Sequence, residues 1–371
     1  MAQRNYKATG INLKAMPMNE SDRLVTVLTK EYGLIRAIAP GARKHKSRLG
    51  GRSGPFVVNE MLLIKGKSID KMVQAETQQS FPKLSTDLAR LTASQYLAEI
   101  ALSQALSDQP QEELYYLLLE HLKRLESASK SNILPCLTQA IFHLLALAGV
   151  APEVFNCAIS RAPLDIELGN PDWKVGFSVA SGGVVMPAEI EKIEGDRLKE
   201  AQQQYAEYQQ ERLAAQGVHL NAASVAEPSG SYLGQSNSGQ SSLSQYSLGQ
   251  SKLGSMPEYR SPQEKRQAAS LRAKVSKEIA QNLGIVDYLS GFELALMQQL
   301  SKPELIVSTS AASPQTGTIG ISGQSLIESG PHQMWRRIEK VLRAYTQYQL
   351  DRPIRSADLI DTSFTAPSPV S

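Results

Sequence analysis

The sequence of 371 residues has only two cysteines, no long apolar run and few aromatic residues. Cys136 and Cys157 are too few for a disulfide framework or for a zinc site built from four cysteines. No run of 18 or more uncharged apolar residues occurs, and residues 1–10 lack the apolar segment of a signal peptide. We therefore expect a cytoplasmic protein with no membrane association, and its 42% hydrophobic content predicts a globular one.

Signatures of common enzymes are missing as well. Gly66-Lys67-Ser68 resembles the end of a phosphate-binding P-loop, but that loop needs a glycine where Met61 stands, and the segment is expected to be a strand. Neither the G-x-S-x-G pattern nor the H-E-x-x-H pattern occurs. The five histidines stand in unrelated contexts: His45, His121, His143, His219 and His332. The sequence therefore predicts neither an enzyme nor a cofactor.

Charge is distributed unevenly along the chain. Residues 1–80 carry fourteen Lys and Arg against six Asp and Glu, a net charge of +8, although the whole chain carries only +3. The remaining residues therefore have a net charge of −5. A domain with such a positive balance attracts polyanions over long distances, so we expect any nucleic-acid contact to lie in the first fifth of the chain.

The basic region has the pattern of a small β-barrel. Short segments rich in β-branched residues alternate with turn signals, and they predict strands at 6–16, 22–29, 33–40, 55–64 and 72–78. Five short strands in so short a domain favour a closed barrel over residues 1–80. Between the third and fourth strands, residues 41–54 form a glycine-rich and basic stretch whose only apolar residues are Ala42 and Leu49. We expect this stretch to be an exposed loop.

Helical periodicity begins after the barrel. Leucines at three- and four-residue intervals predict helices at about 84–101, 110–125 and 133–148, and Gly149 with Pro152 ends the last of them. A hairpin is expected at 175–185. Further helices are expected at 188–216, 263–283, 286–300 and 333–350, the last with Trp335, Ile338, Val341, Leu342 and Tyr345 on one face. The sequence thus predicts an all-α helical domain over residues 81–360.

Two low-complexity tracts interrupt that domain. In residues 229–255, glutamine recurs every five residues among Ser and Gly, and residues 308–325 are similarly polar. Such compositions bury too little apolar surface to offset backbone entropy, so we expect disordered insertions at 217–261 and 307–327. The first is either a regulatory segment or a spacer, and as a spacer its deletion should leave DNA binding intact.

The candidate nucleic-acid site is the stretch between the third and fourth strands. It carries five cations in ten residues, and two more follow the next strand: Arg43, Lys44, Lys46, Arg48, Arg52, Lys65 and Lys67. Flexible glycines and mobile cations suit a phosphate chain, because such contacts release counterions without reading bases. Small barrels of this kind commonly bind single strands. A solvated loop with no ligand is the alternative, and Arg23 and Arg36 are as consistent with structural roles as with DNA contacts.

Aromatic residues that could stack on bases are scarce in this region. Tyr6, Tyr32 and Phe56 are the three aromatic residues in positions 1–80, and we expect Tyr6 and Phe56 to lie in the core. Binding should therefore be mainly electrostatic and tolerant of base sequence.

Several short motifs in this order resemble those of the bacterial recombination mediator family RecO. The basic loop is followed by Pro55-Phe56, by Gly-Lys-Ser-Ile-Asp at 66–70 and by Gln-Ala-Glu at 74–76. Upstream stand Asn-Glu-Ser-Asp-Arg at 19–23 and Lys-Glu-Tyr-Gly-Leu at 30–34, and Arg-Pro-Ile-Arg-Ser at 352–356 ends the last long helix. The resemblance is dense over 1–80, continues to about 152 and returns near 335–355.

This resemblance implies an OB-fold barrel followed by a helical domain, and a role in DNA repair and homologous recombination. Family members bind single- and double-stranded DNA, anneal complementary strands and engage the C-terminal tail of single-stranded-DNA-binding protein. With RecR they help to load RecA, without nucleotide hydrolysis, and they act at the nucleoid. Many relatives carry a four-cysteine zinc module. Here Cys157 matches its first position, but Ser160 stands at the second and residues 185–188 contain no cysteine, so no metal is expected.

One alternative belongs to a different functional class. The basic loop could bind an acidic protein partner, with the repeat tract as a tether in an interaction scaffold. Absence of DNA affinity in a gel-shift assay would favour the scaffold.

Overall fold

The computed structural model describes residues 5–215, 262–304 and 331–364, so both predicted insertions lie outside the described residues. The chain divides into two compact units, residues 1–189 with 281–371, and residues 190–280. The larger unit contains the basic loop. No helix in the described ranges is long and apolar enough to cross a bilayer.

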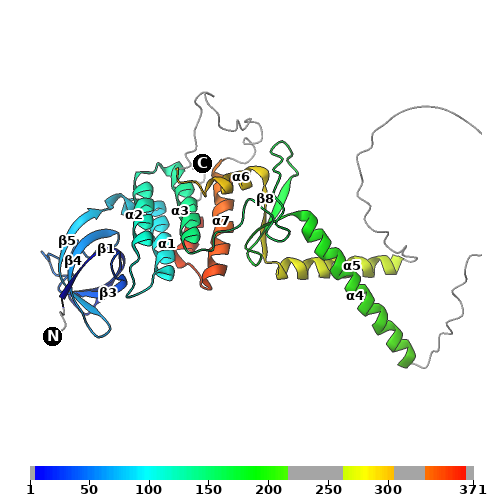
Figure 1. Ribbon diagram of the computed structural model, residues 1–371, viewed down its shortest axis with the longest axis horizontal. Helices are drawn as coiled ribbons and strands as arrows, with labels where there is room; N and C mark the ends of the chain where they lie inside the picture. The colour runs from blue at the N-terminus through cyan, green and yellow to red at the C-terminus, as the bar shows by residue number, and fades with distance from the viewer. Residues whose placement is uncertain (1–4, 216–261, 305–330, 365–371) are drawn as a thin grey trace, which may run out of the picture. The chain divides into compact units, whose positions relative to one another are not determined.

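The N-terminal strands close into a barrel (Figure 1). They are β1 (Asn5–Met18), β2 (Asp22–Thr29), β3 (Gly33–Ala39), β4 (Val57–Ile64) and β5 (Asp70–Ser80). Their order around the barrel is β1-β2-β3-β5-β4, with antiparallel neighbours except for a short parallel contact between β3 and β5. This arrangement confirms the five predicted strands and the OB-like fold.

Side chains on opposite faces of the barrel strands belong to two separate hydrophobic cores. Inward-facing residues such as Val25, Val27, Ile35 and Ala37 fill the barrel. On the outer side of β1 and β2, Ile11 and Leu28 belong instead to the core of the helical domain. Backbone hydrogen bonds reinforce this junction, because the Leu34 amide donates to the Leu106 carbonyl at 2.8 Å.

The helical domain packs around the helix at Ile133–Leu147, most of whose residues are buried. A short helix, η1 (Pro82–Ser85), is followed by α1 (Leu88–Gln104), α2 (Glu112–Ser127), η2 (Lys130–Asn132) and α3 (Ile133–Leu147). After the second gap come α7 (Pro331–Leu350), η3 (Arg355–Ala357) and α8 (Asp358–Ser363). All five apolar residues predicted for one face of α7 are buried, which confirms that prediction.

A small sheet accompanies these helices. The predicted hairpin forms from β6 (Lys174–Ser178) and β7 (Gly183–Val185), and β8 (Ile285–Ser290) pairs antiparallel with the other edge of β6. The helix expected over 286–300 is therefore wrong for its first residues. The β-branched pair Ile285-Val286 finds a strand partner in β6, and Ser290 then caps α6 (Gly291–Gln299) in a reciprocal capping box with Glu293.

In the described part of the smaller unit lie two polar helices, as the sequence predicted. They are α4 (Pro187–Ala215), which starts in the larger unit, and α5 (Pro262–Asn282). In α5, Val275 and Ile279 are buried, whereas Tyr205 and Tyr208 in α4 are exposed.

Candidate nucleic-acid interface

The basic loop, residues 41–54, is a series of tight turns rather than a loose segment. Backbone amides donate to carbonyls three residues earlier at 3.0–3.3 Å: Lys44 to Gly41, Ser47 to Lys44, Gly50 to Ser47 and Gly54 to Gly51. Gly41 has a φ of 62°, which glycine adopts without strain. The backbone of the basic loop is therefore ordered by its own hydrogen bonds.

Two side chains of the basic loop seal one end of the barrel. Ala42 and Leu49 are 3% and 9% exposed and belong to the core inside the barrel. The expectation of a wholly exposed loop is therefore wrong for these residues, since they are its only apolar members and burial of them is favourable. Because this plug holds the backbone, the cations project from a fixed base.

Asp22 and Arg23, at the start of β2, anchor the basic loop. The Asp22 carboxylate accepts from the Gly41 amide at 2.8 Å and from the Ser21 hydroxyl at 3.1 Å, and these bonds hold its pKa below the usual value. The Arg23 guanidinium donates to the Gly50 carbonyl and the Ser53 hydroxyl, both at 3.0 Å. Arg23 thus has a structural role. The sequence alone had left both this role and DNA contact open for it.

Two buried asparagines hold the end of the basic loop. The Asn12 side-chain amide donates to the carbonyls of Arg52 and Gly54, and the Asn59 amide donates to the same Arg52 carbonyl, all at 2.8 Å. Both asparagines are fully buried. The backbone of Arg52 is therefore fixed against both β1 and β4.

The cations of the basic loop differ in how they are held. Lys44, Lys46 and Arg48 are exposed, and within the described ranges none of them makes an ion pair. Arg43 is also exposed but donates to the Asn19 carbonyl at 3.1 Å, and Arg52 is half-buried. The structure brings these five predicted residues together on one short segment, with Lys44, Lys46 and Arg48 the most available to a ligand.

Lys65 and Lys67 lie at the opposite end of β4 from the basic loop. The eight residues of β4 separate the two groups by roughly 25 Å along the strand. Lys65 donates to Asp108 at 3.0 Å, and this bond raises its pKa. Gly66 to Ser68 form the turn into β5 instead of a strand, and a Cβ at Gly66 would lie 1.9 Å from the Ile69 carbonyl oxygen. The P-loop-like glycine thus serves a tight turn.

An open face of the barrel carries two cations, Arg36, whose role the sequence left open, and Lys14, which the sequence did not single out. The register places Lys14, Thr26 and Arg36 in one outward row across β1, β2 and β3, with Met16, Leu24 and Ile38 in the next row. Lys14 and Arg36 are exposed. The outward position of Arg36 can be read from the sequence of β3, where Arg36 stands between the inward-facing Ile35 and Ala37.

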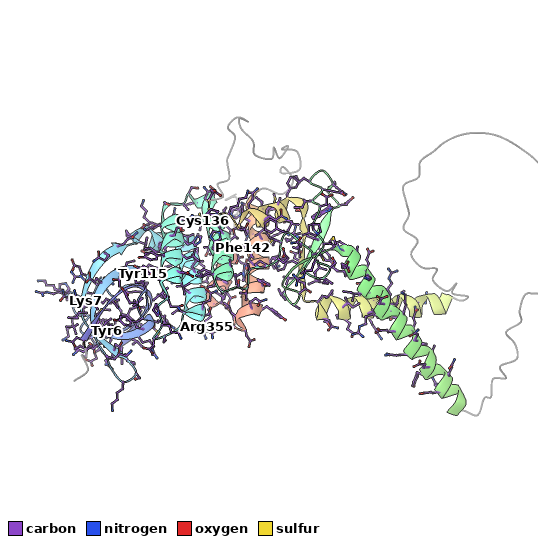
Figure 2. All side chains as sticks on the ribbon, viewed as in Figure 1. Tyr6, Lys7, Tyr115, Cys136, Phe142 and Arg355 are labelled. Carbon is purple, nitrogen blue, oxygen red and sulfur yellow. The ribbon has the colours of Figure 1, made fainter. Side chains whose placement is uncertain are left out.

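The aromatic residues of the barrel have mostly structural contacts. Phe56 is 4% exposed, which confirms its expected place in the core. Tyr6, seen at the barrel in Figure 2, is half-buried, and its hydroxyl donates to Asp70; burial and this bond raise its pKa. Tyr32 packs edge-on against Tyr6 at 4.9 Å between ring centroids and is 39% exposed. Of the three, Tyr32 is the most accessible to a base.

Comparisons with known proteins agree with this architecture. The family model "Recombination protein O N terminal" matches residues 1–81, and "Recombination protein O C terminal" matches residues 85–199. A DNA repair protein RecO from a Nostoc species is 43% identical over 98% of this chain and 97% of its own length. The chain belongs to the RecO family. RecO proteins of Nostoc punctiforme and Gloeothece citriformis are each 40% identical over 97% or more of both chains.

Cys157, the residue that the sequence analysis compared with a zinc ligand, is buried. Burial would raise the pKa of the Cys157 thiol, but hydrogen bonds from Ser160 and from the Met186 amide outweigh it and leave that pKa lowered. Gly183 packs against the backbone of Glu153, since a Cβ there would lie 2.2 Å from the Glu153 oxygen. Across the described ranges, no three His, Cys, Asp or Glu side chains gather as a metal-ligand set.

Two histidines of this RecO-family chain meet, contrary to the expectation that all five stand in unrelated contexts. His121 Nε2 in α2 lies 3.1 Å from His143 Nδ1 in α3. Burial, the neighbouring His143 and Arg124 lower the pKa of His121 to about 3. The pair joins α2 to α3, with His121 buried and His143 half-buried.

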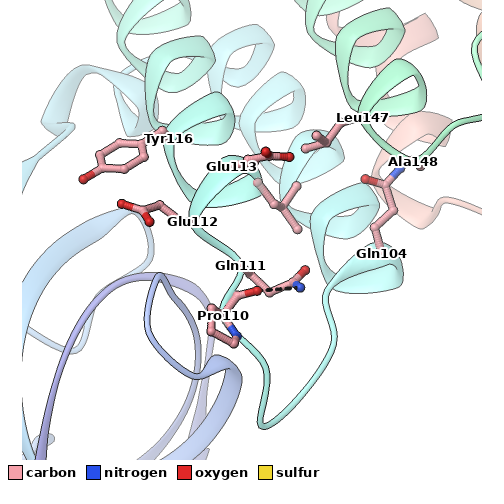
Figure 3. A pocket seen from close by; sticks show the side chains of 9 residues that line it. Gln104, Pro110, Gln111, Glu112, Glu113, Tyr116, Leu147 and Ala148 are labelled. Carbon is pink, nitrogen blue, oxygen red and sulfur yellow. Dashed lines mark hydrogen bonds between the residues drawn. The ribbon is translucent and has the colours of Figure 1, made fainter.

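The helical domain also has a shallow acidic pocket of about 770 Å³, shown in Figure 3. Glu112 and Glu113, at the start of α2, line it together with Gln104, Tyr116 and Leu147. Two carboxylates repel phosphate, so this pocket does not extend the basic loop as a DNA surface.

Proposed function

We propose that this RecO-family chain binds single- and double-stranded DNA through the basic loop and anneals complementary strands. The observation that carries the proposal is the placement of Lys44, Lys46 and Arg48, which are exposed, make no ion pair among the described residues and rise from an ordered backbone. Contacts of this type neutralise phosphates and release counterions. They carry no sequence information, which suits a protein that must accept any pair of complementary strands.

The basic loop has an ordered backbone, so it presents its cations in fixed positions during annealing and does not act as a flexible basic segment. A fixed array of long, flexible side chains can neutralise one strand while its bases stay accessible to a second strand. The scarcity of exposed aromatics supports weak retention of the bases, since each stacked base adds about 1 to 3 kcal/mol of binding. The duplex can then leave the surface once pairing is complete.

Family membership supports a proposal about the partners of this function. We propose that the helical domain engages the C-terminal tail of single-stranded-DNA-binding protein, that RecR binds the chain, and that the complex assists RecA loading indirectly. Annealing and RecA loading would take place at the nucleoid in the cytoplasm. No nucleotide hydrolysis is needed, which is consistent with Gly66-Lys67-Ser68 forming a turn between two strands.

Strand-annealing kinetics test this proposal. The purified full chain is mixed with complementary oligonucleotides without ATP, first naked and then coated with single-stranded-DNA-binding protein, either intact or lacking its tail. We expect annealing of naked strands, annealing of strands with the intact coat, and loss of activity with the tailless coat. No annealing and no salt-dependent DNA binding would instead support a scaffold whose basic loop binds an acidic protein.

A further inference from the structure

A second basic surface lies where the barrel meets the helical domain. A groove of about 650 Å³ runs between β1, α1 and the segment after α7. Its apolar floor includes Leu13, Phe56 and Ile354, and its cations are Lys14, Arg352 and Arg355, all three exposed. Figure 2 shows Arg355 at the end of the bundle where α1 and the chain after α7 meet.

The one acidic residue in the groove is already engaged. The Glu99 carboxylate accepts from the backbone amides of Arg355 at 2.8 Å and Ser356 at 3.3 Å, so it caps the start of η3. Throughout the described part of the chain, neither Arg352 nor Arg355 makes an ion pair. Asp351 and Asp358, the nearest acids in sequence, do not line the groove. The groove therefore has an excess of positive charge and donors to offer a ligand.

The groove is continuous with the basic loop. Pro55 and Phe56 line the groove, and Arg52, the last cation of the basic loop, stands three residues before Pro55. The Asn12 amide binds the carbonyls of both Arg52 and Gly54 and so fixes the backbone that connects the two surfaces. The chain therefore passes from the end of the basic loop directly into the wall of the groove that holds Lys14, Arg352 and Arg355.

We propose that the DNA strand continues from the basic loop into this groove, where Lys14, Arg352 and Arg355 bind its phosphates. This inference rests on the proposed DNA-binding function and extends its site. A path over two surfaces holds a longer stretch of one strand, and the barrel and the helical domain both contribute to it. Continuity with the basic loop favours DNA here over an acidic peptide, which is the other polyanion that these cations would attract.

The test compares the full chain with the double variant R352Q/R355Q. Two oligothymidylates are used: one of about 6 nucleotides, short enough to occupy the basic loop alone, and one of about 20 nucleotides that spans both surfaces. Affinity is measured against salt concentration. For the long oligomer, we expect the slope of log affinity against log salt to flatten by about 1.4 in the variant, because each lost contact with a single strand is worth about 0.7. For the short oligomer, we expect no change.

K123Q/K130Q is the matched control, because it also removes two exposed positive charges from the helical domain, near Ala128 and away from the groove. We expect it to bind both oligomers as the unchanged chain does. An equal loss of slope in the control would overturn the groove path, as would an unchanged slope for the long oligomer in R352Q/R355Q. If R352Q/R355Q instead lost affinity only for a synthetic acidic peptide ending in apolar residues, the groove would be a peptide site and the DNA path would be wrong. Absence of any salt-dependent binding by the unchanged chain is a different result, since it removes the proposed function itself.

Discussion

Arg23 Nη1 donates to the Ser53 hydroxyl at 3.0 Å and so joins the start of β2 to the end of the basic loop. Ser53 is fully buried, and the same nitrogen also reaches the Gly50 carbonyl. A cation from the most basic region of the chain therefore serves to shape the surface on which other cations are displayed. Arg36, on the open face of β3, has no such bonds within the described ranges.

This contrast predicts different outcomes for two similar substitutions. R23M should lower the free energy of unfolding by about 1 to 3 kcal/mol, because it leaves the buried Ser53 hydroxyl and the Gly50 carbonyl without their charged donor. R36M should leave stability within about 0.5 kcal/mol, as exposed substitutions usually do. Urea unfolding of both variants measures these changes. Equal stability of the two variants would show that the Arg23 bonds do not hold the basic loop.

The plug formed by Leu49 gives a second prediction. L49A removes buried methyl groups at the sealed end of the barrel and should destabilise the protein by about 2 to 4 kcal/mol. L49M, which nearly conserves volume, should cost less than about 1.5 kcal/mol. Thermal unfolding compares them. If L49A were as stable as the unchanged chain, Leu49 would not contribute to the core inside the barrel.

Local periodicity explains which elements were predicted correctly from the sequence. The barrel strands are short segments rich in β-branched residues between turn signals, and α7 carries a continuous apolar face, so both patterns are visible within a few residues. β8 differs because its partner β6 lies more than a hundred residues away in the chain. Nothing in residues 286–290 alone distinguishes a strand paired with a distant edge from the first turn of a helix.

The candidate site was predictable in composition but not in geometry. Charge density located the basic loop, yet it did not reveal that Leu49 plugs the barrel or that Arg23 is structural. Lys65 also illustrates the limit, because its ion pair with Asp108 depends on how the barrel meets the connection between α1 and α2. Likewise, His121 and His143 meet only because α2 packs against α3.

The exposed cations of the basic loop predict a specific salt dependence. The triple variant K44Q/K46Q/R48Q should weaken single-strand binding and flatten the salt slope by about 2, since each lost phosphate contact contributes about 0.7. Stability should change little, because these side chains are exposed. The control K83Q/K123Q/K130Q removes three exposed charges from the helical domain. Similar slopes for the two variants would mean that net charge, and not the basic loop, governs DNA affinity.

The buried histidine pair predicts a loss of stability in mild acid. His121 stays neutral in the folded protein, because its pKa is lowered to about 3, whereas in the unfolded chain it binds a proton below about pH 6.5. The unfolded state therefore gains protons first as the pH falls, and stability declines through the window between about 6.5 and 3. For His121 alone the loss should reach about 2 kcal/mol at pH 5. Burial lowers the pKa of His143 as well, which acts in the same direction.

The variant H121Q separates this effect from other titrations. Arg124 and Glu120 lie beside the pair. Carboxylates with lowered pKa values, such as Asp22 and Asp361, titrate at lower pH. Glu339 acts in the opposite direction, because burial raises its pKa, but H121Q leaves Glu339 unchanged. Chemical unfolding at pH 7 and pH 5 should therefore give a smaller difference for H121Q than for the unchanged chain. An identical difference in both proteins would show that His121 is not the group that senses acid.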